Sequence, residues 1–155
     1  MAAGDELWVD AGPFRAHLRH LVDVGGFTAT EIAVLAGVPP RMAISLLLGR
    51  AGRPVRRISA ANARALLQLG ATDVRALRTR QVPAEESRTR LRRLLRGQRL
   101  PDLAEELGVA VSSLQELVDG GSAWCSARLA LKLLTTSRTR PGAAEAPAPL
   151  VGVAA

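Results

Sequence analysis

Apolar residues recur every three or four positions along most of the chain, which is the spacing of helices that bury one face. In the first half, this pattern predicts helices over about residues 11–24, 28–36, 39–48, 59–69 and 72–79. In the second half, it predicts helices near about residues 85–96, 101–107, 111–119 and 123–135. Aromatic and β-branched residues are too few to favour strands, so the predicted fold class is all-α.

Two of these helices, within the segment EIAVLAGVPPRMAISLLLG (residues 31–49), meet at a tight turn. A helix-turn-helix needs a small residue where the helices approach, a turn residue with positive φ, and apolar anchors on the second helix. Ala33 supplies the small contact and Gly37 the turn, and the anchors are Val38, Ala43 and Leu46. The spacing therefore predicts a helix-turn-helix. Thr28, three residues before Glu31, predicts a capping box at its start.

The second half of the chain is a diverged repeat of the first. A shift of 71 residues brings LAEELGV (103–109) onto IAVLAGV (32–38), and a shift of 73 brings RLRRL (90–94) onto HLRHL (17–21). The small contact, the turn and the anchors of the second copy are then Ala104, Gly108, Val109, Leu114 and Leu117.

The repeat predicts two tandem, diverged helix-turn-helix units. The first covers residues 8–80 and the second residues 83–136, with Gln81, Val82 and Pro83 as the join. Residues 137–155 are rich in alanine and proline and show no apolar face, so we expect a disordered tail there.

Positive charge is concentrated in the first unit. The whole chain has a formal net charge of +7, and Lys132 is its only lysine. Residues 11–80 carry eleven arginines and three acidic residues, whereas residues 81–140 carry ten basic and seven acidic residues. No acidic residue occurs in residues 32–72, which hold six arginines. This asymmetry favours a polyanionic partner for the first unit.

The segment of residues 31–49 resembles the helix-turn-helix family of DNA-binding proteins. The wider runs WVDAGPFRAHLRHL, AGVPP and LLLGRAGRPVRRISAANARALL are similar to small actinobacterial and actinophage proteins of that family. The resemblance covers about residues 8–69 and, less closely, about residues 88–135. It implies that the chain binds duplex DNA, with the second helix of the helix-turn-helix in the major groove.

In that geometry, the candidate base contacts lie between the inward-facing anchors of the helix that starts at Pro39 or Pro40. Arg41 and Ser45 can hydrogen-bond to base edges, while Pro40 and Ile44 can touch thymine methyl groups. Because only two of these residues are polar, we expect weak sequence discrimination by this helix.

The loop GRAGRPVRR, residues 49–57, is expected to be exposed and flexible. Its arginines would contact phosphates or enter the minor groove, and Gly52-Arg53-Pro54 resembles the core of an AT-hook. The candidate contacts of the loop and the following helix are Arg50, Arg53, Arg56, Arg57 and Arg64.

In the second unit, Ser112 and Gln115 are the candidate DNA contacts. Glu116 and Asp119 lie near them and would oppose phosphate, so contact with a protein is the other interpretation of this unit.

The sequence thus predicts a cytoplasmic, nucleoid-associated DNA-binding protein, either a transcriptional regulator or a repressor. A helical protein-interaction module that binds, for example, a sigma factor or a replication protein is the alternative, and a homodimer is compatible with both. No nucleophile elbow, phosphate loop or carboxylate pair indicates an enzyme. We expect no cofactor and no metal, since His17, His20 and Asp23 lack further ligands nearby. A lone cysteine, the lack of a secretory signal and the lack of a long apolar run argue against disulfides and a membrane.

Overall fold

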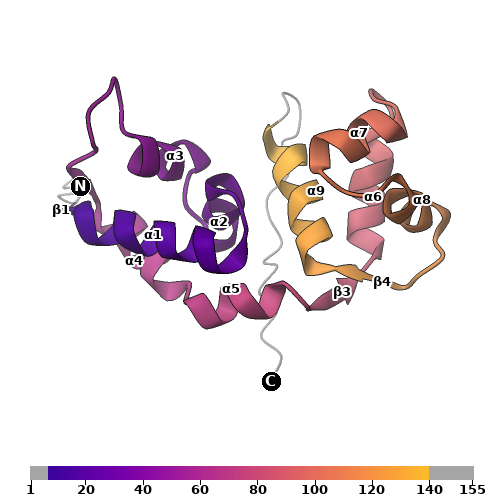
Figure 1. Ribbon diagram of the computed structural model, residues 1–155, viewed down its shortest axis with the longest axis horizontal. Coiled ribbons are helices and arrows are strands. Elements are labelled where there is room, and N and C mark those ends of the chain that lie inside the picture. Colours follow the sequence, from indigo (N-terminus) through magenta and orange to yellow (C-terminus); the bar gives the residue numbers. More distant parts are fainter. Residues whose placement is uncertain (1–6, 140–155) are drawn as a thin grey trace, which may run out of the picture. The chain divides into compact units, whose positions relative to one another are not determined.

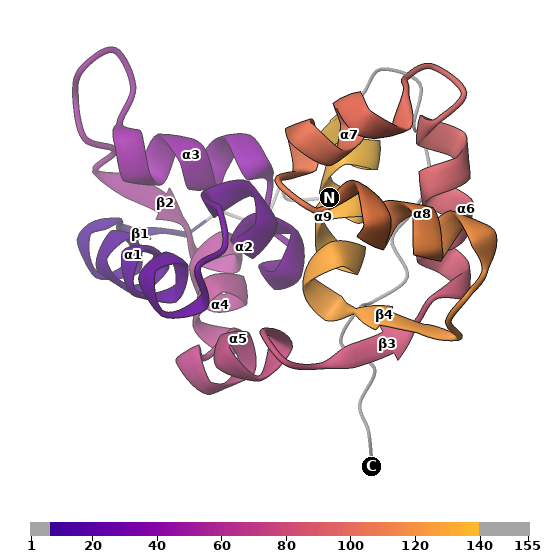
Figure 2. The ribbon, with the colours of Figure 1, turned by 45° about the vertical axis from the view of Figure 1, so that its right-hand side comes forward.

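Two pairs of short antiparallel strands organise the helices of this protein into two units. The computed structural model describes residues 7–139, and the chain divides between Ala76 and Leu77. In each unit, a strand is followed by three helices, by a second strand that pairs with the first, and by a further helix. Figures 1 and 2 show this order from two directions. The described part of the chain is therefore mostly helical.

The first unit begins with strand β1 (Trp8–Asp10) and ends in two helices. Its elements after β1 are α1 (Gly12–Gly25), α2 (Ala29–Ala36), α3 (Pro40–Leu48), β2 (Arg57–Ser59), α4 (Ala60–Gln68) and α5 (Ala71–Leu77).

The second unit repeats this order from its first strand to its last helix. Its elements are β3 (Gln81–Pro83), α6 (Glu85–Leu94), α7 (Leu100–Leu107), α8 (Val111–Asp119), β4 (Trp124–Ser126) and α9 (Ala127–Thr139).

The strands correct the prediction of an all-helical chain. β1 pairs with β2 and places Val9 opposite Ile58, and β3 pairs with β4 and places Val82 opposite Cys125. Each strand has three residues, too few to show the two-residue alternation of a strand in the sequence. Each gains its hydrogen bonds from a partner far along the chain, which no local pattern reports. The expected loop 49–57 accordingly ends in β2, and Gln81–Pro83 is a strand of the second unit rather than a join.

The paired strands hold two helix starts together in each unit. In the first unit, the Ala60 N–H donates to the Leu7 carbonyl (2.6 Å), and the Ala11 N–H donates to the Arg56 carbonyl (2.9 Å). In the second unit, the Ala127 N–H donates to Arg80 and the Ala84 N–H to Ala123, both at 2.9 Å. The N-terminal ends of α1 and α4 in the first unit, and of α6 and α9 in the second, are thereby fixed.

The residues predicted to face inward are buried. Ala33, Ala43 and Leu46 have no exposed surface, and Val38 is also buried. Leu18, Leu21, Ile32 and Leu66 of the same unit are fully buried as well. In the second unit, Ala104, Leu114 and Leu117 are buried in one apolar cluster, and Val109 packs against it. The predicted anchors are thus confirmed as core residues in both units.

The turn after α2 has the predicted backbone. Gly37 has φ +75, and its counterpart Gly108 in the second unit has φ +64. In each turn the N–H of the following valine donates to the small contact residue, from Val38 to Ala33 and from Val109 to Ala104, both at 3.0 Å. The capping box is also confirmed, because the Thr28 side chain accepts from the Glu31 N–H and the Glu31 carboxylate accepts from the Thr28 N–H.

The last helix is longer than expected. α9 continues to Thr139, so residues 137–139, which were predicted to start a disordered tail, are helical. The Ser137 hydroxyl donates to the Leu133 carbonyl at 2.7 Å within this helix. The rest of the predicted tail, residues 140–155, lies outside the described residues.

Replacing Gly37 by alanine tests the turn. The added Cβ meets no atom within 4 Å, so only the positive φ opposes the substitution. We expect Gly37→Ala to destabilise the protein by about 1 kcal/mol, measured by urea unfolding. The matched control is Gly12→Ala, where φ is not positive and the nearest atom lies at 3.4 Å, so that stability stays the same or rises slightly. Equal stability of the two variants would contradict the left-handed turn.

Candidate nucleic-acid interface

The outer face of α3 is mostly apolar. Arg41, Ile44 and Leu48 are spaced three and four residues apart and lie opposite the buried Ala43 and Leu46. Ile44 is 40% exposed and Leu48 is 79% exposed. This face therefore offers one cationic side chain and two branched apolar side chains to a partner.

This face agrees in part with the contacts predicted from the sequence. Arg41 and Ile44 are exposed, as the proposed contact requires, whereas Pro40 and Ser45 are only partly exposed. Leu48 was missed, although its position four residues after Ile44 could have indicated it.

The loop after α3 contains an ordered hairpin. The Arg50 N–H donates to the Arg53 carbonyl (2.8 Å), and the Arg53 N–H donates to the Arg50 carbonyl (3.0 Å). Ala51 and Gly52 between them have φ +49 and +73, the pattern of a type I′ hairpin turn. In both ribbon views the loop projects from the end of α3 (Figures 1 and 2). The tip of the loop, for which no regular structure was predicted, is thus closed by two backbone hydrogen bonds.

The guanidinium groups of most candidate arginines of the first unit have no hydrogen-bond or ion-pair partner among the described residues. All of those predicted are exposed. Within residues 7–139, no hydrogen bond or ion pair engages the guanidinium groups of Arg41, Arg50, Arg53, Arg56 or Arg64. Five cationic groups are thus free to meet an anion.

Two of the predicted arginines differ from the rest. Arg57 donates through Nη2 to the Trp8 carbonyl at 2.7 Å, so part of its donor capacity supports the strand pair. Arg64 lies on α4, which packs against α1 and α2 and lies apart from α3 in both views (Figures 1 and 2). The structure therefore places Arg64 on a helix apart from α3, which carries Arg41 and leads into the loop arginines.

An arginine that the sequence analysis did not single out fixes the end of α3. Arg15 of α1 donates through Nε to the Leu46 carbonyl (2.8 Å) and through Nη2 to the Val55 carbonyl. In the second unit, Arg88 of α6 makes the equivalent bonds, to Leu117 (2.8 Å) and Ser122 (2.9 Å). The shift of 73 residues, which superimposes Arg15 on Arg88, was the available signal.

His17 has a structural partner of the same kind. Its Nε2 lies 3.0 Å from the carbonyl oxygens of both Leu66 and Leu69. Two acceptors at one nitrogen mean that Nε2 carries the proton and donates it, which ties α1 to the end of α4.

The helix that carries the predicted contacts of the second unit has an acidic surface. Ser112 and Gln115 of α8 are exposed, as are Glu116 and Asp119. Gln115 donates through Nε2 to Asp119 Oδ1 at 2.9 Å, so one predicted contact is held beside a carboxylate. An anionic ligand would meet repulsion on this face.

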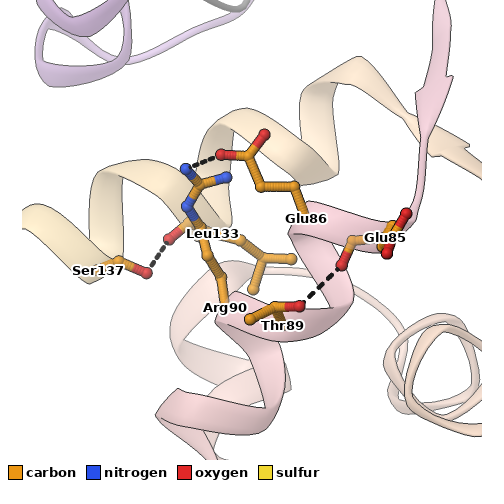
Figure 3. Close-up of polar contacts among 6 residues, drawn as sticks. All are labelled: Glu85, Glu86, Thr89, Arg90, Leu133 and Ser137. Carbon is orange, nitrogen blue, oxygen red and sulfur yellow. Dashed lines mark hydrogen bonds and ion pairs between the residues drawn. The ribbon is translucent and has the colours of Figure 1, made fainter. Parts of the chain in front are cut away.

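Several arginines of the basic helix α6 have partners within their own unit. Figure 3 shows Arg90 paired with Glu86, one turn earlier on the same helix. The same view shows Thr89 donating to the Glu85 carbonyl (3.1 Å). Arg88 is engaged as described, and Arg92 donates to the Val118 carbonyl at 3.1 Å. Three arginines that the sequence presents as a basic face are therefore committed to partners inside the unit.

The second unit has a hollow of about 320 Å³ between α8, the strand pair and α9. Trp124, which is 57% exposed, and Glu116 both line it. An aromatic ring and a carboxylate in one hollow are suited to a cationic side chain.

Other site types have no support in the described residues. Within residues 7–139, no three histidine, cysteine, aspartate or glutamate side chains gather in a way that could hold a metal ion. No helix in that range is long and apolar enough to cross a membrane. In comparisons with known proteins, the chain matches no protein-family model, no curated protein and no solved structure.

Proposed function

We propose that the first unit binds duplex DNA and that the protein acts as a transcriptional regulator or repressor. One observation carries this proposal: the free arginines of the loop follow directly on α3, in a segment where residues 32–72 contain no acidic residue. Cationic groups without internal partners are available to neutralise phosphates, and the nearby chain adds no opposing charge.

In this proposal, α2 and α3 act as a helix-turn-helix, with α3 in the major groove. Arg41 would contact a base edge, while Ile44 and Leu48 would meet thymine methyl groups. The hairpin arginines would contact phosphates or enter the minor groove. The apolar outer face of α3 favours a protein with weak sequence preference, whose affinity comes chiefly from the loop.

The wider assignment rests on the same surface. The resemblance to small actinobacterial and actinophage helix-turn-helix proteins supports a regulator that works on the nucleoid without catalysis or cofactor. A homodimer would double the number of phosphate contacts, as in many proteins of this kind.

Contact with another protein is a second candidate function, and it concerns the second unit. The hollow lined by Trp124 and Glu116 and the acidic surface of α8 favour a partner with a cationic segment. The internal engagement of Arg88, Arg90 and Arg92 points the same way, because it leaves fewer free cations in this unit.

Salt dependence tests the DNA proposal directly. If about five phosphates are neutralised, the logarithm of the affinity should fall against the logarithm of the salt concentration with a slope of about −4.5. Fluorescence anisotropy of a labelled duplex over a salt series measures this slope. A slope near zero, or no binding at about 50 mM salt, would refute duplex binding.

Substitutions separate the roles of α3 and the loop. Arg41→Ala should cost roughly 1–3 kcal/mol on a duplex selected from random sequences and should flatten preference at one position. Arg56→Ala should weaken a selected and a scrambled duplex equally and reduce the slope by about one, since phosphates carry no sequence information. Arg75→Ala, an exposed arginine on α5, is the matched control. If a loop substitution abolishes discrimination and Arg41→Ala does not, the loop is the reader.

The second unit is tested by removing its two predicted DNA contacts together. If this unit binds protein rather than DNA, Ser112→Ala with Gln115→Ala should leave the duplex affinity within about twofold and the salt slope unchanged. A loss of about tenfold or more, roughly 1.4 kcal/mol, would place α8 on the DNA instead.

A further inference from the structure

A hollow in the first unit lies between α1, the end of α3 and the hairpin. Its volume is about 270 Å³. Its lining includes the apolar residues Leu47, Leu48 and Pro54 and the cationic residues Arg15, Arg19 and Arg53. No acidic residue lines it.

The walls of this hollow are held in place by Arg15. Its bonds to the Leu46 and Val55 carbonyls join α1 to the end of α3 and to the chain that returns from the hairpin. The C-terminal end of a helix carries partial negative charge, which would repel an anion. By donating to a carbonyl at that end, Arg15 offsets this charge and makes the position tolerable for an anion.

Arg19 and Arg53 approach the hollow from different elements. Arg19 lies one turn after Arg15 on α1, and Arg53 lies on the hairpin. Both are exposed, and neither guanidinium group has a partner among residues 7–139. The hairpin closes tightly at its base, where a Cβ on Gly49 would come within 2.4 Å of the Arg53 carbonyl oxygen. The backbone that carries Arg53 is therefore fixed relative to α3.

The second unit provides an internal comparison. Arg92 occupies the position of Arg19 after the shift of 73 residues, and it donates to the carbonyl of Val118. The connection between α8 and β4 has four residues (120–123), against eight (49–56) between α3 and β2. Without a hairpin there is no counterpart of Arg53, and Arg92 of α6 donates instead to the C-terminal end of α8. In the first unit, Arg19 is left free.

We propose that Arg19 and Arg53 clamp a single phosphate in this hollow. Two guanidinium groups can share the oxygens of one phosphate, and the lining carbon of Leu48 and Pro54 would contact an attached sugar. This deepens the proposed function, on which it rests, by assigning the ligand as a phosphodiester of the duplex beside α3. A free phosphate offers the same chemistry.

The duplex experiment compares salt slopes for Arg19→Gln, Arg53→Gln and the double variant. If both arginines grip one phosphate, the double variant should lose about 0.9 from the slope in total. A loss of about 1.8, the sum expected for two separate phosphates, would overturn the shared clamp, as would no loss. Arg75→Gln on α5 and Arg92→Gln in the second unit make the same charge change outside the hollow and should leave the slope unchanged.

A second measurement separates the clamp from the DNA proposal. Inorganic phosphate is titrated into the full-length protein while the Nε–H signals of the arginine side chains are followed by NMR. Arg19 and Arg53 should shift together with one dissociation constant, and Arg75 and Arg92 should not. If the protein binds no duplex but shows these shifts, the proposed function fails and the hollow is a site for free phosphate. If it binds no duplex and the two signals stay still or shift like every other arginine, the clamp is overturned as well.

Discussion

A partly buried arginine that hydrogen-bonds to backbone carbonyls, Arg15 in the first unit and Arg88 in the second, is the interaction on which the rest of each unit depends. It reaches from the first long helix to two carbonyl groups on either side of the following connection. Lost bonds to such carbonyls would leave acceptors at a helix end without a donor, which is costly where water is scarce. The strand pair fixes the helix starts, and the arginine fixes the opposite end of the third helix. Together they determine where the connection emerges.

The two units share this frame and use their charge differently. In the first unit, Arg50, Arg53 and Arg56 of the connection have no hydrogen-bond or ion-pair partner for their guanidinium groups among residues 7–139, so their charge is available to a ligand. In the second unit, Arg90 forms an ion pair with Glu86, and Arg92 donates a hydrogen bond to the Val118 carbonyl at the end of α8. Counting arginines along the sequence would rank α6, which has four, first among the described helices. The number of arginines that are available to a ligand depends on their tertiary partners, and by that measure α6 no longer ranks first.

The sequence predicted what is determined locally. The capping box at Thr28, the left-handed Gly37 and the buried faces of the helices follow from short-range stereochemistry and from apolar spacing, and all are present. The three-residue strands and the Arg15 bonds join residues far apart in the chain, and no periodicity reports such pairs. The hairpin tip was missed because Ala51 is an unusual residue for positive φ, where asparagine would have signalled the turn. Of the candidate site, residue types were predictable, while the separation of Arg64 from α3 required the fold.

The hairpin closes on itself through the paired Arg50 and Arg53 backbones, so its tip is an appendage that supplies its own backbone hydrogen bonds. The second unit shows the frame without it, with a connection of half the length. Such an arrangement separates stability from chemistry during evolution, since the appendage can lengthen, shorten or change composition while the frame persists. The second unit could therefore receive the hairpin as a graft. Transplanting residues 49–56 in place of residues 120–123 would add arginines without internal partners to a unit in which several arginines bind groups within it.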